Sequence, residues 1–381
     1  MRRLHVCEVI KDLGVGGAEM LLVERLLAAP ATGVRYTVIC QGAKTDELIQ
    51  RLRAAGTEVI TFAAWPRRLR LARLAVEVGR LRPDVLNLHS PLPASLLRLT
   101  SRLSRPRPAL VSTVHNVRYR LPTMLLDRAT GWLDARTVAV SPQVARAVVS
   151  RGARNLVTRI HGINVAELRR RAGEAARTRQ EWNVPESAFL IAHVGNFRPQ
   201  KQHGVLIEAA AKVVDRDPRA VFLLAGTGPL YEETARRVAE LGSDNVRLLG
   251  HVPDAARLIA SADLLVLSSA HEGLPVVVME ALAAGVPVVS TAVGGVPDLI
   301  DNGRNGLLTR PGDPDALAEA ILRAMRPEVH AQLREEIRNN ADPVDITQTA
   351  EWFERLYDEV VTDGGRNGHG HAPRRRQAER L

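Results

Sequence analysis

Short runs rich in Val, Ile and Leu alternate with helical patterns along most of this 381-residue chain, and this alternation constrains the fold more than any other feature. The first half holds such runs at 4–10, 35–40, 58–62, 85–89, 109–115, 137–141 and 156–160. The second half holds them at 189–194, 220–224, 246–249, 264–267 and 287–290. Apolar strands that alternate with helices form a parallel sheet with helices on both faces. The pattern therefore predicts an α/β protein with two Rossmann-like domains.

The domain boundaries follow from a break in this alternation. A polar stretch at 167–186 has no strand pattern, and we interpret it as the linker between the two halves. The prediction is a first domain over 1–166 and a second domain over 167–345. A length of 381 residues also suits two domains.

The last part of the chain has a helical pattern. Asp313 gives an acidic, cap-like start to a predicted helix that ends at Met325. Aromatic and aliphatic side chains form an apolar face on a second predicted helix over 346–362. Residues 363–381 are rich in Gly, Arg and His without apolar periodicity, so they are predicted to form a disordered basic tail.

The composition is ordinary for a globular protein with a large core, at 45% hydrophobic and 25% charged residues. The apolar run after Arg3 is short and meets Lys11, which is not the pattern of a secretory signal, and no segment has the pattern of a transmembrane helix. Cys7 and Cys40 both fall in predicted strands. We interpret them as buried thiols in a reducing cytoplasm.

The formal net charge is +10, and arginine supplies most of the positive charge. Residues 66–108 contain ten arginines but only two acids, Glu77 and Asp84. Two interpretations stay open: an electropositive face for an anionic membrane or a phosphate-bearing acceptor, or a solvated helix surface. Aromatic residues make up only 3% of the chain and no stacking platform is evident, so we expect no nucleic-acid partner.

Glycine motifs follow three of the predicted strands. Gly16 and Gly17 come after the first strand, Gly195 after the first strand of the second half, and Gly226 after the next one. Ligands of open parallel sheets bind beyond the carboxyl ends of the strands, where glycine permits a close backbone approach and a helix start favours phosphate. An ordinary strand-to-helix turn explains each motif equally well. Neither a full dinucleotide pattern nor a Walker A motif is present.

Polar side chains follow other predicted strands. Arg198 and Lys201 place two cations where a leaving diphosphate would need neutralising, although basic pairs are also common on surfaces. His115 ends one predicted strand, and His89 and Ser90 end another. These three are candidates to line a ligand site, and a histidine bonded to nearby backbone is the simpler alternative.

Two carboxylates, Glu272 and Glu280, lie eight positions apart after the run at 264–267. This spacing is slightly over two helical turns, so both side chains are predicted to face one ligand near a helix N-terminus. Carboxylates accept hydrogen bonds from hydroxyl groups, such as those of a sugar or a ribose. The alternative is a cap carboxylate followed by an exposed helix residue.

The stretch from Ser268 to Ile300 resembles the signature of the family 4 glycosyltransferases, retaining enzymes with two Rossmann-like domains that face each other across a cleft (the GT-B fold). The resemblance continues in the motifs at 16–19, 195–201 and 224–229, and in order and spacing it covers nearly the whole chain. It implies that the second domain binds a nucleotide-diphosphate sugar and that the first binds most of a sugar or lipid-linked acceptor. It also implies that the last helix crosses back onto the first domain.

The resemblance assigns donor contacts to particular residues. Glu272 would bind sugar hydroxyls and Glu280 the nucleotide ribose. The backbone N–H groups of Gly273 and Leu274 would meet the sugar or the phosphates, and backbone near Val252 would contact the base. The donor site also includes the motif glycines: Gly16, Gly17, Gly195 and Gly226.

The resemblance also assigns the chemistry. His115 would contact the donor sugar near the reacting centre, while Lys201 and Arg198 would aid departure of the nucleoside diphosphate. In the family an arginine stands where this chain has Asn196, so Arg198 would have to replace it. His89 and Ser90 would line the acceptor site.

The resemblance therefore implies a cytoplasmic hexosyltransferase active in cell-envelope, exopolysaccharide or glycolipid biosynthesis. It would act at the inner face of the membrane if the arginine-rich segment forms a face for anionic lipid. The leaving phosphate would take the acceptor proton, and we expect no cofactor and no obligatory metal, since no Asp-x-Asp motif occurs. Two alternatives remain. One is a nucleotide-sugar epimerase or hydrolase on the same fold, and the other is a non-catalytic two-Rossmann protein that binds nucleotide or acts as a scaffold.

Overall fold

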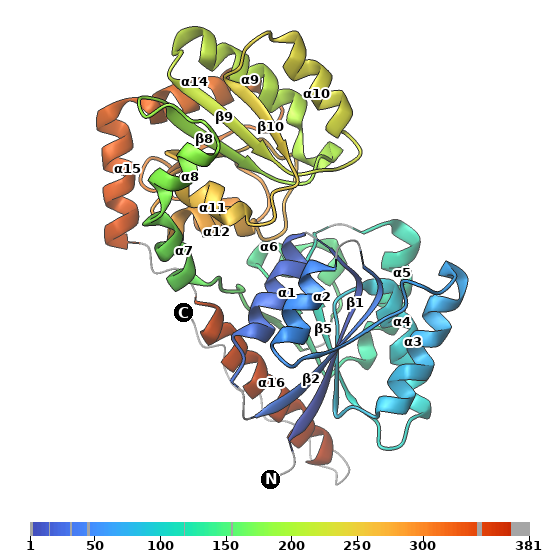
Figure 1. Cartoon of the computed structure of the whole chain (residues 1–381). Helices are drawn as coiled ribbons and strands as arrows, with labels where there is room; N and C mark the ends of the chain where they lie inside the picture. Colours follow the sequence, from blue (N-terminus) through green and yellow to red (C-terminus); the bar gives the residue numbers. More distant parts are fainter. Residues whose placement is uncertain are drawn as a thin grey trace.

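The computed structural model describes residues 3–14, 16–30, 33–43, 46–117, 119–153, 155–340 and 345–366. It contains two parallel sheets, each flanked by helices, which form two domains placed one above the other in Figure 1. This is the predicted architecture of two Rossmann-like domains. None of the described helices is long and apolar enough to span a membrane.

The first domain is built on a seven-stranded sheet with the order β3-β2-β1-β4-β5-β6-β7. Its strands are β1 Leu4–Leu13, β2 Val34–Ala43, β3 Glu58–Thr61, β4 Val85–Leu88, β5 Ala109–Val114, β6 Arg136–Ala139 and β7 Leu156–Thr158. The flanking helices are α1 Gly17–Leu27, α2 Glu47–Ala54, α3 Arg67–Leu81, α4 Pro91–Thr100, η1 Ser101–Leu103, α5 Leu121–Thr130, η2 Gly131–Leu133, α6 Pro142–Arg146 and η3 Val148–Ser150. All predicted strands of this half are confirmed. Cys7 and Cys40 are buried free thiols, also as predicted.

The second domain has a six-stranded sheet with the order β10-β9-β8-β11-β12-β13. Its strands are β8 Phe189–Val194, β9 Ala220–Ala225, β10 Val246–Gly250, β11 Leu264–Leu267, β12 Val288–Thr291 and β13 Gly306–Thr309. The helices are α7 Val165–Ala172, α8 Ala175–Glu181, η4 Pro199–Lys201, α9 His203–Arg216, α10 Tyr231–Glu240, α11 Ala255–Ser261, α12 Val276–Ala283, α13 Val296–Leu299, α14 Pro314–Met325 and α15 Pro327–Asn340. The five predicted strands are confirmed, and β13 is an edge strand that the sequence pattern did not reveal. Asp313 caps α14 as expected, since its side chain accepts a hydrogen bond from Ala316 N at 2.9 Å.

The predicted linker at 167–186 is wrong as a description of this segment. The segment belongs to α7 and α8, and both helices pack against α11 of the second domain. Leu168 is buried in a cluster with Met279 of α12, and Arg171 forms an ion pair with Asp254 at 3.0 Å. These two helices are therefore an integral part of the second domain.

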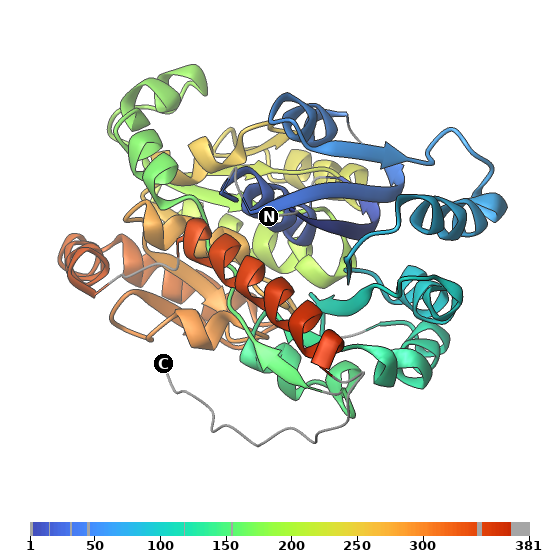
Figure 2. The same ribbon diagram turned by 90° about the horizontal axis from the view of Figure 1, so that it is seen from below.

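The last helix, α16 Ile346–Arg366, crosses back and packs against the first domain, as Figures 1 and 2 show. Its buried side chains Phe353, Tyr357 and Val360 join a cluster with Val6 of β1 and Val85 of β4. This confirms the predicted return of the chain. The helix continues to Arg366, so the prediction of a disordered tail from residue 363 is wrong for its first four positions. The rest of that tail, residues 367–381, lies outside the described residues.

Candidate functional site

The second domain brings Lys201 and Glu272 together at the carboxyl edge of its sheet. Lys201 ends η4, shortly after β8, and Glu272 lies in the loop after the neighbouring strand β11. Lys201 Nζ lies 2.6 Å from Glu272 Oε1, and the two side chains are only 14% and 9% exposed. Ser269 Oγ donates a second hydrogen bond, at 2.6 Å, to the same carboxylate oxygen. A cation and a carboxylate that the sequence predicted separately thus form one polar cluster.

The loop that carries Glu272 is held by hydrogen bonds from side-chain hydroxyls to backbone carbonyls and by one close backbone contact. Ser268 Oγ donates to the Lys201 carbonyl at 2.8 Å, and Thr291 Oγ1 of β12 donates to the Ser269 carbonyl at 2.6 Å. Gly294 has a φ of +55°, and a Cβ there would lie 1.9 Å from the Glu272 carbonyl oxygen. Only glycine fits this position. The loop geometry, and with it the position of Glu272, is therefore set by three neighbouring strand ends.

Glu280 has different surroundings from Glu272. Since α12 begins at Val276, Glu280 lies little more than one turn into the helix and Glu272 lies before it, so the expected two-turn spacing is wrong. Burial raises the pKa of Glu280 to about 7, and nearby Arg171 offsets this only in part. Glu24 of the first domain also acts on this carboxyl group. Near neutral pH, Glu280 is thus poised between its charged and its neutral form.

Arg198 does not join the Lys201 cluster. Its side chain is exposed, and within the described part of the chain it forms no hydrogen bond or ion pair. Gly195 lies beside the cluster, because a Cβ there would contact Lys201 Cε and His193 Nε2, both at 3.4 Å. The role of Arg198 in place of the arginine missing at Asn196 therefore stays a prediction.

Three more of the predicted glycines lie at element ends, and one of them, Gly226, permits close backbone packing. Gly226 has a φ of +142°, and a Cβ there would lie 2.0 Å from the Gly195 carbonyl oxygen, so the loops after β8 and β9 lie backbone to backbone. Gly16 is the N-cap of α1. A Cβ at Gly17 would lie 3.4 Å from Val276, which places the start of α1 against the start of α12.

The two domains also meet at Gly273. A Cβ on Gly273 would lie 2.4 Å from the carbonyl oxygen of His115. Leu274, the next residue, packs against Val140 and Val144 of the first domain. Val252, by contrast, lies half-buried in the core of the second domain. The Glu272 loop and the end of β5 are thus neighbours across the domain boundary.

His115 and His89 lie at the ends of the neighbouring strands β5 and β4 and contact each other. His115 Nε2 lies 2.9 Å from His89 Nδ1, and His89 Nε2 lies 2.7 Å from Glu8 Oε2. Burial lowers the pKa of His115 well below its usual value, and neighbouring His89 and Arg25 act in the same direction. His115 is therefore neutral at physiological pH. Both ring nitrogens of His89 are engaged, so this residue has none left for an acceptor.

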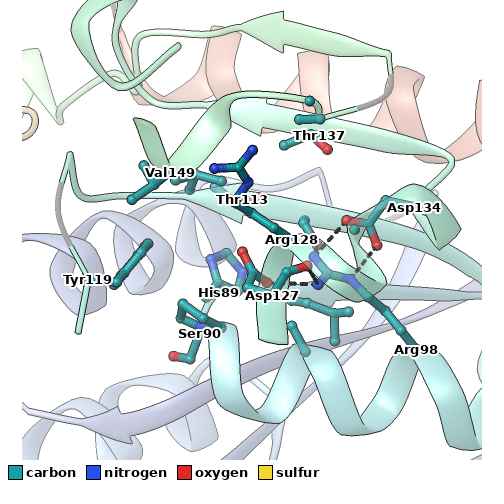
Figure 3. A pocket seen from close by; sticks show the side chains of 18 of the residues that line it. His89, Ser90, Arg98, Thr113, Tyr119, Asp127, Arg128, Asp134, Thr137 and Val149 are labelled. Atoms are coloured by element: carbon teal, nitrogen blue, oxygen red, sulfur yellow. Dashed lines mark hydrogen bonds and ion pairs between the residues drawn. The ribbon is translucent and has the colours of Figure 1, made fainter. Parts of the chain in front are cut away.

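A cavity of about 150 Å³ opens beside His89 and Ser90 in the first domain, as Figure 3 shows. Ser90 is the N-cap residue of α4, and its hydroxyl accepts a hydrogen bond from Lys11 N at 3.0 Å. The cavity is lined by residues of several strands, helices and loops, including Thr113, Tyr119 and Val149. His89 and Ser90, which were predicted to line an acceptor site, thus both line this cavity, and its use by an acceptor stays a prediction.

Charged side chains give this cavity a net positive character. Arg98 is buried and pairs with Asp127 and Asp134, both at 2.7 Å, as drawn in Figure 3. Arg128 and Arg151 also line the cavity, and neither has an ion pair among the described residues. Three guanidinium groups thus face two carboxylates. Arg98 could not be singled out from the sequence, since its partners lie 29 and 36 positions away.

Other residues of the site were also not predicted. Ser269, Glu8 and Arg25 contact predicted residues or their partners, yet they stand in or beside apolar or helical patterns that mark them only as parts of an element.

Among the residues that the structure describes, no three His, Cys, Asp or Glu side chains lie close enough to hold a metal ion.

Comparisons with known protein families cover both domains. The family model described as Glycosyl transferases group 1 matches residues 188–326, and that described as Glycosyltransferase Family 4 matches residues 15–166. The protein called "Putative glycosyltransferase EpsD" from Bacillus subtilis is 30% identical over 292 residues, which cover 72% of this chain and 76% of that protein.

Several other relatives match over a shorter span. N-acetyl-alpha-D-glucosaminyl L-malate synthase from Bacillus anthracis is 31% identical over 193 residues, 50% of each chain. D-inositol 3-phosphate glycosyltransferase from Saccharomonospora viridis is 34% identical over 204 residues, 50% of this chain and 47% of that one. The chain thus spans about half the length of these curated relatives.

Solved structures show the same fold. Anabaena HepE in complex with UDP and glucose has a TM-score of 0.83 at 20% identity, covering 94% of this chain and 100% of that one. The lipopolysaccharide-biosynthesis glycosyltransferase WaaG has a TM-score of 0.71 at 18% identity, covering 92% of this chain and 99% of that one. The two-domain architecture is therefore that of GT-B proteins.

Proposed function

The chain belongs to the family 4 glycosyltransferases, and we propose that it transfers a sugar from a nucleotide-diphosphate sugar to an acceptor hydroxyl with retention of configuration at the anomeric carbon. The observation that carries the proposal is the meeting of the two predicted half-sites. The Lys201–Glu272 pair of the second domain and His115 of the first lie on opposite sides of the contact between Gly273 and the His115 carbonyl. Each domain therefore contributes polar side chains near the contact between the two domains.

The donor side of the proposal rests on the Lys201–Glu272 cluster. Glu272 would accept hydrogen bonds from hydroxyls of the donor sugar, and Glu280 would do so from the ribose. Lys201, aided by Arg198 and by backbone N–H groups at Gly273 and Leu274, would neutralise the departing diphosphate. Because a cation stands at this position, the reaction would need no metal ion. The solved HepE structures with UDP, glucose and UDP-glucose support a uridine-containing donor.

The acceptor side rests on the cavity beside His89 and Ser90. Arg128 and Arg151, which form no ion pair within the described part of the chain, favour an acceptor that carries a phosphate or carboxylate group. Two relatives carry malate and inositol 3-phosphate in their names, and both of these are anions. The acceptor hydroxyl would attack from the face that the diphosphate leaves, and the leaving phosphate would take its proton.

We also propose that the first domain docks on an anionic membrane at its cytoplasmic face, where cell-envelope, exopolysaccharide or glycolipid acceptors would be assembled. All large apolar side chains that are exposed among the described residues lie between 65 and 132. They are Trp65, Leu69, Val76, Leu92, Leu99, Leu103, Leu121, Leu125, Leu126 and Trp132. The arginine-rich segment 66–108 overlaps this surface. Apolar side chains among basic ones suit an interface of anionic lipid.

Sedimentation with lipid vesicles tests the membrane proposal. The chain should bind vesicles that contain anionic lipid, bind neutral vesicles weakly, and lose binding in the variant Leu99→Glu/Leu125→Glu. Equal binding of that variant would remove this surface from the proposal.

A thermal-shift screen against nucleoside diphosphates and their sugars, with and without chelator, tests the donor site. A ligand that binds the folded state raises Tm by mass action. We expect a shift with one nucleotide that survives chelation. The additional shift produced by the sugar of the matching nucleotide sugar should disappear in Glu272→Ala. Product analysis by NMR then reports the anomeric configuration. Consumption of donor without any acceptor would favour an epimerase or hydrolase, and no shift with any nucleotide would favour a non-catalytic scaffold.

A further inference from the structure

A buried chain of polar side chains leads from His115 into the first domain. The chain passes from His115 after β5 to His89 after β4 and then to Glu8 of β1, with nitrogen-to-nitrogen and nitrogen-to-oxygen distances of 2.9 Å and 2.7 Å. Relative exposures are 7% for His115, 6% for His89 and 0% for Glu8. These three groups therefore exchange hydrogen bonds with one another rather than with water.

Glu8 is held from its other side by two elements distant in the sequence. Its Oε1 accepts hydrogen bonds from Arg25 Nη2 of α1 at 2.6 Å and from the Tyr357 hydroxyl of α16 at 2.8 Å. Burial alone would raise the pKa of Glu8, but Arg25 and His89 more than offset it and lower the pKa to about 2. Glu8 is thus ionised, and its Oε2 can only accept the bond from His89.

This arrangement fixes where the protons of both histidines lie. An ionised carboxylate has no hydrogen to donate, so His89 must carry its proton on Nε2. Arg25 is the charged partner of Glu8, and the neutral form of His89 then has Nδ1 as its acceptor, facing His115 Nε2. His115 Nε2 must then donate to His89. His161, whose ring centroid lies 5.9 Å from that of His115, is also neutral because burial lowers its pKa, so it adds no charge.

We propose that Glu8 and His89 are positioning residues that hold His115 as its Nε2–H tautomer and leave the Nδ1 lone pair as the acceptor for a hydroxyl group of the bound sugar. The second half of this statement rests on the proposed function, since it takes His115 to contact the sugar. The first half depends only on the contacts within the first domain. An imidazole in the opposite tautomer would offer a donor at Nδ1 instead and would repel a hydroxyl hydrogen.

The hydrogen-bonded series Glu8, His89 and His115 is called the relay below. The substitution Glu8→Gln tests it because glutamine nearly preserves the shape of the side chain and reverses the hydrogen bond to His89. The amide oxygen takes the place of Oε1, where Arg25 and Tyr357 both donate, so the amide NH₂ faces His89. His89 Nε2 must then accept, and the protons of both rings move. We expect His115 to change from the Nε2–H to the Nδ1–H tautomer.

Tautomers are read directly by long-range ¹⁵N–¹H NMR of the full chain labelled with ¹⁵N-histidine, with His89→Asn and His115→Asn used to assign the signals. Wild type should show Nε2–H for both rings, and Glu8→Gln should show Nδ1–H for both. Sugar transfer by Glu8→Gln should fall by about 10- to 100-fold in kcat, the effect of one acceptor replaced by a donor. The KM for the donor should change far less.

Tyr357→Phe is the matched control. It removes a hydrogen bond to Oε1 of the same carboxylate but leaves the Glu8 charge and its contact with His89 in place. A merely structural role predicts similar behaviour for both variants. The relay predicts that Tyr357→Phe keeps the wild-type tautomers, and that its kcat stays within about 3-fold of wild type.

Three results separate the possible failures. A wild-type spectrum with His115 protonated at Nδ1 overturns the inference even if sugar is transferred, and this spectrum needs no variant to fold. Unchanged tautomers in a folded Glu8→Gln variant overturn it as well. Nε2–H tautomers in a protein that transfers no sugar contradict the proposed function and leave the tautomer assignment standing.

Discussion

Replacing Gly273 with alanine should hold the two domains apart. A Cβ at this position would lie 2.4 Å from the carbonyl oxygen of His115 and 3.5 Å from its carbonyl carbon. A carbon–oxygen contact needs about 3.3–3.6 Å, so the two backbones must separate by about 1 Å. The obstacle is backbone and cannot turn aside as a flexible side chain would. A misplacement of about 1 Å between reacting groups costs roughly 100-fold in rate, so Gly273→Ala should lower kcat for transfer by about that factor.

Gly79→Ala is the matched control, since a Cβ on this residue of α3 meets nothing within 4 Å. Alanine in a helix interior stabilises the fold by about 0.5–1 kcal/mol relative to glycine, so this variant should gain in Tm and transfer at the wild-type rate. For both variants we would measure kcat at saturating donor, Tm, and the Tm shift produced by the nucleotide. Gly273→Ala should keep its nucleotide-induced shift, because the donor cluster around Lys201 lies within one domain.

Two outcomes would refute this reasoning. Transfer at nearly the wild-type rate by a folded Gly273→Ala would mean that catalysis does not require the domains to approach as closely as they do here. Loss of the nucleotide-induced shift would mean that the substitution acts within the donor loop and not between the domains.

The remaining predictions concern charge. Because the pKa of Glu280 is raised from 4.5 to about 7, the folded state holds more protons than the unfolded state between these values, and the free energy of unfolding should fall with rising pH by up to about 3 kcal/mol. Glu280→Gln should lack this fall in urea titrations at pH 5 and pH 7.5, and an equal slope in both proteins would contradict the assignment. Lys201→Met should cost about 2–3 kcal/mol by leaving Glu272 unpaired, and adding Glu272→Gln should recover most of it without restoring transfer, as denaturation and activity assays together would show. Arg98→Met should cost about 3–5 kcal/mol because Asp134 is left buried without its partner, and a Tm within error of wild type would exclude a buried charge there.

Most of the fold was predictable because it depends on local patterns. Twelve strands are short runs rich in apolar residues, and such runs are visible without any knowledge of their neighbours. Four of them, β4, β9, β11 and β12, are buried along their whole length. β13 was missed because it is a four-residue edge strand that follows turn residues and is buried over only half its length. α7 and α8 were missed because they are mostly polar, and only Val165, Leu168 and Thr178 are buried along them.

The candidate site was predictable only where its residues follow strand ends. His89, His115, Lys201 and Glu272 all stand at such positions, and the parallel topology brings them to the sheet edges. The buried residues that hold these side chains in position were not predictable. Glu8 meets partners 17, 81 and 349 positions away, and no spacing rule relates residues at such separations.

The course of α16 has a consequence for synthesis of the chain. When a ribosome has made the first 166 residues, all seven strands of the first sheet exist, but Phe353, Leu356, Tyr357 and Val360, which complete its core, do not. At about 5–20 residues per second, the 180 residues up to the start of the helix take roughly 10–35 s more. Domains usually fold in the order in which they are made. Here the domain made first is completed last, and the nascent chain carries an apolar sheet face through the whole synthesis of the second domain.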